Sequence, residues 1–325
     1  MVGRMVKQGI LFLAIAVVVV AVYGYLNYSV QTRYENGKLV YWKIVPKGGR
    51  SGEATPIDSP EDGLRPTIRI ASFQLGRLDE AKLSNRRVAD VLAHLVPQFD
   101  LMAVQGVRGK SQAALVRLID QVNATSGRTF DFITCPTQRR DALEHYSAFL
   151  FDRARIDVDR NTVHFVEDRL NRFQTKPLVG AFRVRGPDAD QAFTFTLINV
   201  EVDPEHAAAE LDLLAEVYRA VRNDGRGEDD VIVLGDLEAD DHHLGELGKL
   251  FGATALFSNV PTTTRGTRLA DNIVIDRRAT VEFTGRTEVI DLMRQFNLTM
   301  AEAMEVSEHL PISAEFSSYE GTGRP

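Results

Sequence analysis

The sequence reads VIVLGDLEAD at residues 231–240, and its pattern of apolar and acidic residues indicates the fold class. Its first four residues form a continuous apolar run, which is typical of a strand buried on both faces in a sheet that helices cover. The run ends at Gly235 and Asp236, so a carboxylate follows the strand at the edge where open α/β sheets bind ligands. The stretch therefore predicts an α/β domain with a ligand site at one edge of its sheet.

The segments before this strand predict further strands and helices. Strand-like residues 67–73 and 100–104 alternate with helical residues 79–96 and 111–124. Strand-like runs then follow one another, which predicts an antiparallel block, at residues 130–134, 147–152, 162–166, 179–184 and 193–200.

The segments around and after the strand complete the pattern. A helix that begins at Asp203 and Pro204 extends to about residue 221 and leads into the central strand. Two further strands are expected at residues 272–275 and 312–316. The simplest layering of these elements is helix, sheet, sheet, helix.

Composition and charge exclude several classes of protein. Hydrophobic residues make up 44% of the 325 residues and charged residues 26%, which is typical of a globular protein with a sizeable core. The net charge of -7 argues against a protein that holds nucleic acid by bulk positive charge. The single cysteine, Cys135, excludes an intramolecular disulfide framework and any site built from several cysteines.

The N-terminus carries a membrane signal. Residues 8–32 lack charge, and residues 10–22 are almost purely aliphatic, so the run can span about 30 Å of hydrocarbon at about 1.5 Å per residue. A cleaved signal peptide is the alternative, but no clear cleavage site follows the apolar run. We expect residues 1–30 to form a single-pass transmembrane anchor, with the main domain on the extracytoplasmic side.

The segment after the anchor divides into two parts. Asn36 and Gly37 lie between two strand-like runs, which favours a hairpin with a two-residue turn. Residues 46–66 are rich in Pro, Gly and acidic residues and predict a flexible tether. Residues 31–66 therefore form a short hairpin and tether, residues 67–317 the folded domain, and residues 318–325 a tail.

Acidic residues and one histidine cluster near the predicted strand ends. Asp236 and Glu238 follow the central strand, Asp271 precedes the next, and Glu308 and His309 precede the last. Carboxylates beside an imidazole suit the binding of a cation and the activation of water. Taken singly, each also has an ordinary explanation as a turn or loop residue.

Taken together and in this order, the motifs resemble the endonuclease/exonuclease/phosphatase superfamily, and in particular its deoxyribonuclease I-like members. The resemblance covers about residues 68–316. It rests on seven blocks, which read IASFQ at residues 70–74, AVQGVR at 103–108, EHYSAFLF at 144–151, LINVEVDP at 197–204, LGDLEAD at 234–240, ADNI at 270–273 and SEHLP at 307–311.

The resemblance implies a four-layer αββα sandwich in which two mixed sheets pack face to face and the active site lies at one end between them. It implies hydrolysis of a phosphate ester or nucleic acid with Mg²⁺ or another divalent cation. The implied catalytic residues are His309, Asp236, Asp271 and Glu308. The resemblance implies Glu144 as a metal ligand, and we expect Glu308 and the added carboxylate of Glu238 to be further ligands.

The chain departs from the family pattern at Gln74, Gly106, Thr175, Glu201 and Glu238. Gly106 stands where the family has a glutamate that is a principal metal ligand, and Glu201 stands where it has a catalytic histidine. Gln74 replaces an asparagine, Thr175 an arginine, and Glu238 an asparagine that contacts phosphate. Glu201 and Glu238 thus place negative charge where an anionic phosphate should bind.

These substitutions predict a degenerate member with weak or no metal-dependent phosphodiester hydrolysis. One acid–base group contributes about 10²- to 10⁴-fold in rate, and a metal several kcal/mol, so losing both removes most of the activity. The alternative is an active, re-specialised phosphoesterase or nuclease, because Glu201 and Glu238 add carboxylates near Asp236 and Glu308 that suit a hard cation such as Ca²⁺. A membrane-tethered binding module that reuses the fold is the non-enzymatic interpretation, with its protein partner unknown.

Overall fold

The computed structural model describes residues 28–35, 38–46, 65–109, 112–135 and 145–321. The expected anchor at residues 1–30 lies outside the described residues except for its last three, and residues 47–64 of the expected tether lie outside them entirely. Within the described ranges, no helix is long and apolar enough to cross a membrane.

The described residues belong to two separate units. The first contains β1 (Tyr28–Glu35) and β2 (Lys38–Pro46), which pair antiparallel. The register irregularity between Arg33 and Tyr34 is a local break in this ladder. The first unit is therefore a two-stranded ribbon.

Two mixed sheets form the second unit. Among the described residues, each sheet has six strands, in the orders β13-β14-β3-β4-β6-β5 and β11-β12-β10-β9-β8-β7. The pairs β3 with β4 and β9 with β10 are parallel, and the others are antiparallel. The strands of the first sheet are β3 (Thr67–Leu78), β4 (Leu101–Arg108), β5 (Phe130–Ile133), β6 (His145–Asp152), β13 (Phe283–Val289) and β14 (Ile312–Ser317). Those of the second are β7 (Ile156–Phe165), β8 (Leu178–Val184), β9 (Thr194–Glu201), β10 (Val231–Asp236), β11 (Ala253–Ala255) and β12 (Asp271–Asp276).

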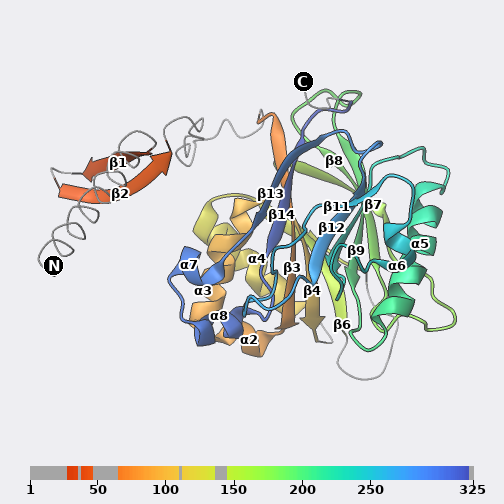
Figure 1. Ribbon diagram of the computed structural model, residues 1–325, viewed down its shortest axis with the longest axis horizontal. Helices are drawn as coiled ribbons and strands as arrows, with labels where there is room; N and C mark the ends of the chain where they lie inside the picture. Colours follow the sequence, from red (N-terminus) through yellow and green to blue (C-terminus); the bar gives the residue numbers. More distant parts are fainter. Residues whose placement is uncertain (1–27, 36–37, 47–64, 110–111, 136–144, 322–325) are drawn as a thin grey trace, which may run out of the picture. The chain divides into compact units, whose positions relative to one another are not determined.

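Helices cover the outer face of each sheet, as Figure 1 shows. Those over the first sheet are α2 (Glu80–Ser84), α3 (Arg86–Leu95), the 3₁₀ turn η2 (Val96–Gln98), α4 (Ala113–Ser126), α7 (Leu292–Phe296) and α8 (Met300–Val306). Those over the second sheet are α5 (Ala207–Arg222) and α6 (Gly245–Gly248). The order helix, sheet, sheet, helix confirms the predicted α/β sandwich.

Strand β10 shows why the apolar run at residues 231–234 takes this position. Val231 and Val233 pack with the α5 and α6 side of the second sheet, whereas Ile232 and Leu234 pack between the two sheets. Side chains on a strand alternate between its faces, so a strand between two cores must be apolar on both. The continuous apolar run is thus explained by burial on both faces.

The single helix expected at residues 79–96 is divided into two. Asn85 ends α2 and begins α3, because its side-chain oxygen accepts a hydrogen bond from the Arg87 N–H at 3.0 Å. Asn side chains favour such N-cap positions over helix interiors, since they satisfy backbone N–H groups at the start of a helix. The apolar spacing correctly predicted α3, but it did not reveal the break at Asn85.

Strand register brings three carboxylates to one edge of the second sheet. Asp236 is the last residue of β10, and it lies opposite Glu201 at the end of β9 and opposite Asp271 at the start of β12. Neighbouring strands are about 4.8 Å apart, so these residues are adjacent.

A buried hydrogen bond also joins the two sheets. Nε2 of Gln105, on β4 of the first sheet, donates to Asn199 Oδ1, on β9 of the second, at 2.7 Å.

Candidate active site

A buried histidine–carboxylate pair forms the centre of the site. His309 Nδ1 lies 2.9 Å from Asp271 Oδ2, and the two residues are only 8% and 1% exposed. The Thr262 hydroxyl accepts a hydrogen bond from the Asp271 N–H, and the Thr264 hydroxyl donates to the carbonyl of His309. The Asp271 carboxylate therefore fixes the imidazole in one orientation, with Nε2 directed away from it.

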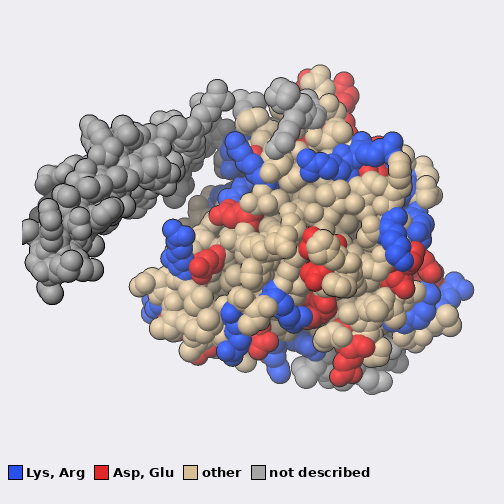
Figure 2. All heavy atoms as spheres, viewed as in Figure 1, with Lys and Arg blue, Asp and Glu red and all other residues tan. Residues whose placement is uncertain are grey.

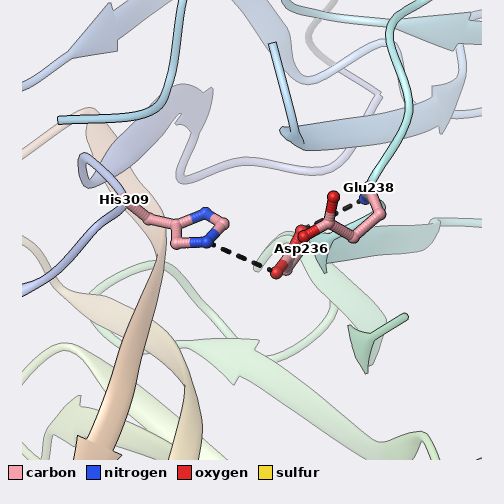
Figure 3. Close-up of side chains that lie close together, drawn as sticks. All are labelled: Asp236, Glu238 and His309. Carbon is pink, nitrogen blue, oxygen red and sulfur yellow. Dashed lines mark hydrogen bonds and ion pairs between the residues drawn. The ribbon is translucent and has the colours of Figure 1, made fainter. Parts of the chain in front are cut away.

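Asp236 lies on the other side of this imidazole. His309 Nε2 is 3.7 Å from Asp236 Oδ2, as drawn in Figure 3. The other carboxylate oxygen, Oδ1, accepts a hydrogen bond of 3.1 Å from the Glu238 N–H. Gly235, just before it, has φ +146°, and a Cβ there would lie 2.0 Å from the Val200 carbonyl oxygen. Only glycine therefore allows the turn that presents Asp236.

Burial and mutual charge set the protonation of this cluster. Burial, together with the nearby Asp271 carboxylate, raises the pKa of Asp236 well above its ordinary value. Burial by itself would lower the pKa of His309, but the hydrogen bond and charge of Asp271 outweigh it and raise this pKa to about 9. At neutral pH the imidazole is therefore a cation held by the Asp271 carboxylate.

Arg268 neutralises Glu238. Its guanidinium donates two hydrogen bonds to the Glu238 carboxylate, one from Nη1 to Oε2 and one of 3.0 Å from Nη2 to Oε1. Bidentate pairs of this kind are among the stronger ion pairs in proteins. The negative charge that Glu238 introduces is thus offset by an exposed cation at the mouth of the site. No sequence motif pointed to Arg268, which lies in a loop three residues before Asp271.

A second histidine–carboxylate pair lies at the neighbouring position. Nε2 of His145, the first residue of β6, is 2.7 Å from Oε2 of Glu201, which also accepts the Gly106 N–H at 3.2 Å. The sequence motif included His145, but only the fold shows that it faces Glu201. The substituted position 201 therefore has a histidine partner.

Gly106 cannot carry the glutamate that the family pattern places there. The residue has φ +77°, and a Cβ would lie 2.5 Å from Gln74 Oε1 and 2.8 Å from the Gly76 carbonyl oxygen. The same Gln74 Oε1 accepts a hydrogen bond of 2.8 Å from the Gly76 N–H. The substitutions at positions 74 and 106 thus form one rearranged turn, with no room for a longer side chain on this backbone.

The structure does not bring every expected residue to the cluster. Glu308 is exposed, and among the described residues its side chain makes no hydrogen bond or ion pair, whereas its backbone carbonyl accepts the Thr264 N–H at 2.8 Å. Thr175 is only partly buried, and the nearby Arg172 pairs instead with Asp168 and Glu216. Glu144 lies outside the described residues.

The remaining donors suit a divalent cation. One ligand atom from each of Asp236, Glu238 and His309 lies within 4.8 Å of the others. In addition, Asp271 Oδ1 is buried without a hydrogen-bond partner among the described residues. Carboxylate oxygens are the donors that Mg²⁺ takes, usually one or two of them with water and substrate phosphate completing the shell. Asp236 and Glu238 are therefore the residues that could hold such an ion.

Comparisons with known proteins point to one group of enzymes. No protein-family model matches the chain. Deoxyribonuclease-1-like 1 of Sus scrofa is 27% identical over 261 residues, covering 77% of this chain and 81% of that protein. Deoxyribonuclease-1-like 2 of Homo sapiens is 24% identical, covering 75% of this chain and 90% of that protein.

Solved structures show the same fold. The structure of D. rerio TDP2 in complex with a single-strand DNA product aligns with a TM-score of 0.53 at 14% identity and covers 78% of this chain and 100% of that chain. A conserved protein of unknown function from Enterococcus faecalis V583 aligns with a TM-score of 0.52 at 15% identity, covering 77% of this chain and 100% of that chain.

Proposed function

Because the chain is a deoxyribonuclease I-like member of the endonuclease/exonuclease/phosphatase superfamily, we propose that residues 67–317 form a slow, divalent-cation-dependent phosphoester hydrolase. The observation that carries the proposal is the buried His309–Asp271 pair, whose Nε2 lies 3.7 Å from Asp236. Burying two carboxylates and an imidazole is unfavourable, so their assembly at one sheet edge supports a chemical role.

In the proposed mechanism, each of these side chains has a distinct task. Asp236, whose pKa is raised toward the neutral range, accepts the proton of the attacking water as the new O–P bond forms. The P–O bond to the leaving group breaks in the same step, and the departing oxygen takes up a proton from solvent. His309, held protonated by Asp271, donates a hydrogen bond to the charge that develops on the phosphate oxygens. A divalent cation held by Asp236 and Glu238 would supply further charge stabilisation and a more acidic water.

The rearranged positions support a low turnover. Gly106 removes one carboxylate donor, and Glu201 removes the imidazole that the family pattern places on β9. Each acid–base contribution is about 10²- to 10⁴-fold, and effects within one catalytic unit are not additive. We therefore expect rates well below those of a member without these substitutions.

A second candidate function is a non-catalytic binding module for phosphate esters. The closed turn at Gly106 favours it, because this backbone has no room for the missing ligand. Bulk charge does not favour nucleic acid as its ligand: on the face in Figure 2, acidic and basic side chains are interspersed rather than gathered into a basic patch.

The deciding experiment measures hydrolysis of supercoiled plasmid and of a chromogenic phosphodiester by the full chain in detergent, with Mg²⁺, Mn²⁺ or Ca²⁺. His309→Ala is the test variant, and His94→Ala, which changes an exposed histidine on α3, is the matched control. Turnover that only His309→Ala abolishes supports the hydrolase. If the parent protein turns over no faster than His309→Ala but still binds the substrate, the result supports the binding module.

We also propose that the chain is anchored in a membrane by the apolar run at residues 10–22, with the main domain on the extracytoplasmic side. The proposal rests on the length of this run and on its freedom from charge. Extraction of membranes at alkaline pH should leave the full chain in the pellet. External protease should remove the main domain from intact cells or spheroplasts, and protection of the domain would reverse the orientation.

A further inference from the structure

Three acidic side chains meet at a place distant from the candidate active site. Asp230 directly precedes β10, Glu282 directly precedes β13, and Glu320 follows β14, so the group joins both sheets to the C-terminal segment. One carboxylate oxygen from each of the three lies within 4.8 Å of the others. Because Asp230 and Asp236 are at opposite ends of β10, about 20 Å of strand separates this group from the active site.

Two of the three carboxylates are buried, and the group has no basic partner among the described residues. Asp230 and Glu282 are each 1% exposed. Among the described residues, none of the three carboxylates pairs with a lysine, arginine or histidine within 4.0 Å. Charges that are taken out of water without a counter-ion are strongly unfavourable, so this arrangement needs a positive charge or protons.

The backbone holds these carboxylates so that free oxygens remain. Glu282 Oε1 accepts the Gly321 N–H at 2.6 Å, and Glu320 Oε2 accepts the Thr194 N–H at 3.1 Å. In contrast, Asp230 Oδ1 and Glu282 Oε2 are buried without a hydrogen-bond partner of good geometry among the described residues, and the buried Thr280 hydroxyl faces the Asp230 carboxylate. Unpartnered buried oxygens of this kind are rare in folded proteins, and a bound cation would give them a partner.

We propose that Asp230, Glu282 and Glu320 bind one divalent cation, and that this cation is Ca²⁺. The donors are all hard oxygens, with no sulfur or imidazole that would favour zinc or copper. Ca²⁺ accepts six to eight oxygen ligands in flexible geometry, so three carboxylates, water and the Thr280 hydroxyl suit it better than they suit Mg²⁺. The ion would fasten the C-terminal segment to the two sheets.

Solvent can reach this group from one side. Glu320 lines a surface cavity of about 540 Å³ together with Glu228 and Asp229. Ligand atoms of Glu228, Asp229 and Asp230 also lie within 4.8 Å of one another. The cavity brings solvent to the Glu320 carboxylate, and because five carboxylates and two arginines line it, its net charge is negative and favours cations.

The test measures thermal unfolding and calorimetric Ca²⁺ binding of the full chain in detergent at neutral pH, after EDTA treatment and dialysis. All proteins carry Asp236→Asn, so that ion binding at the active site does not contribute. Millimolar Ca²⁺ should raise the Tm by roughly 5 °C or more. The calorimetric titration should show one Ca²⁺ ion bound per chain. Mg²⁺ should raise the Tm less.

Glu282→Gln and, separately, Glu320→Gln should abolish both signals, whereas Glu246→Gln, at an exposed site, should leave them intact. If Glu282→Gln fails to fold, Glu320→Gln still tests the proposal, because the Glu320 side chain is exposed and its replacement should not prevent folding. Absence of a Ca²⁺-dependent shift, or a shift that survives both substitutions, would overturn the proposal. So would a Glu282→Gln protein that is more stable than its parent and indifferent to Ca²⁺, since the carboxyls would then simply be protonated.

Discussion

Glu201 is paired with His145 at 2.7 Å, although these residues lie on different sheets and 56 positions apart in the chain. Glu201 also lies in register with Asp236, so the pair lies beside the candidate catalytic carboxylate. A half-buried glutamate without a partner would repel both Asp236 and a phosphate. His145 gives Glu201 a close partner and retains an imidazole near position 201.

The His145–Glu201 pair should behave as one unit. His145→Ala is expected to lower kcat/KM by about 10- to 100-fold, since it leaves the Glu201 carboxylate without its partner beside Asp236. The exchanged variant His145→Glu with Glu201→His should recover part of that loss. A double-mutant cycle on kcat/KM measures the coupling, expected at about 0.5–3 kcal/mol. Strictly additive effects of the two single changes would show that the pair has no joint role.

Asp271 should act by orienting and charging His309. Asp271→Asn is expected to lower kcat by about 10²- to 10⁴-fold with little change in KM, because the imidazole loses the partner that fixes its tautomer and holds its proton. The pH–rate profile should also shift, since the pKa of His309 falls when the carboxylate is removed. A profile identical to that of the parent protein would contradict this role.

Gly106 should tolerate no side chain. Gly106→Ala is expected to destabilise the protein by more than Gly127→Ala, which is the matched control. Both glycines have positive φ, but a Cβ at Gly127 would meet nothing within 4 Å, whereas one at Gly106 would overlap Gln74 and Gly76. The shared φ penalty is about 1 kcal/mol, and the overlap should add roughly 1–3 kcal/mol, as measured by urea denaturation. Equal losses at the two positions would argue against the closed turn.

Stability of the metal-free protein should fall as the pH rises through the neutral range. Burial, together with the Glu282 charge, raises the pKa of Asp230 to about 8, so the folded chain keeps a proton that the unfolded chain loses near pH 4. This contribution is complete below about pH 4 and is lost as the pH approaches 8, at up to about 1.4 kcal/mol per pH unit.

Urea denaturation in EDTA at a series of pH values checks this slope. Asp230→Asn should flatten it, whereas Asp188→Asn, at an exposed position, should not. Added Ca²⁺ should also flatten the slope in the parent protein, because the ion replaces the protons. A slope that is unchanged in Asp230→Asn would assign the pH dependence to other groups.

Much of the fold could be predicted from sequence because the central strands are buried on both faces and therefore read as continuous apolar runs. Strand β13 escaped prediction, since most of its side chains are exposed and the residues from Gly285 to Glu288 show no apolar alternation. The break at Asn85 was also missed, because a local cap can override a helical apolar pattern.

Site residues could be predicted from the sequence only where they lie at or near the end of a predicted strand. Asp236, Asp271 and His309 adjoin β10, β12 and β14, so the sheet itself brings them together. Arg268 and the partner of Glu201 could not be found in this way, because their contacts depend on how loops and opposite sheets meet. Glu308 shows the opposite case: its motif position predicted a ligand, whereas its side chain is exposed to solvent.

The alternation along β10 limits how the gene for this protein can change. Val231 and Val233 face one core and Ile232 and Leu234 the other, with Asp230 and Asp236 at the two ends. Gaining or losing one codon within this strand would turn every following side chain to the opposite face and move one carboxylate out of its cluster. Replacing one apolar residue of β10 by another should be tolerated. Insertions and deletions in related sequences should be confined to the surface loops on either side of the strand.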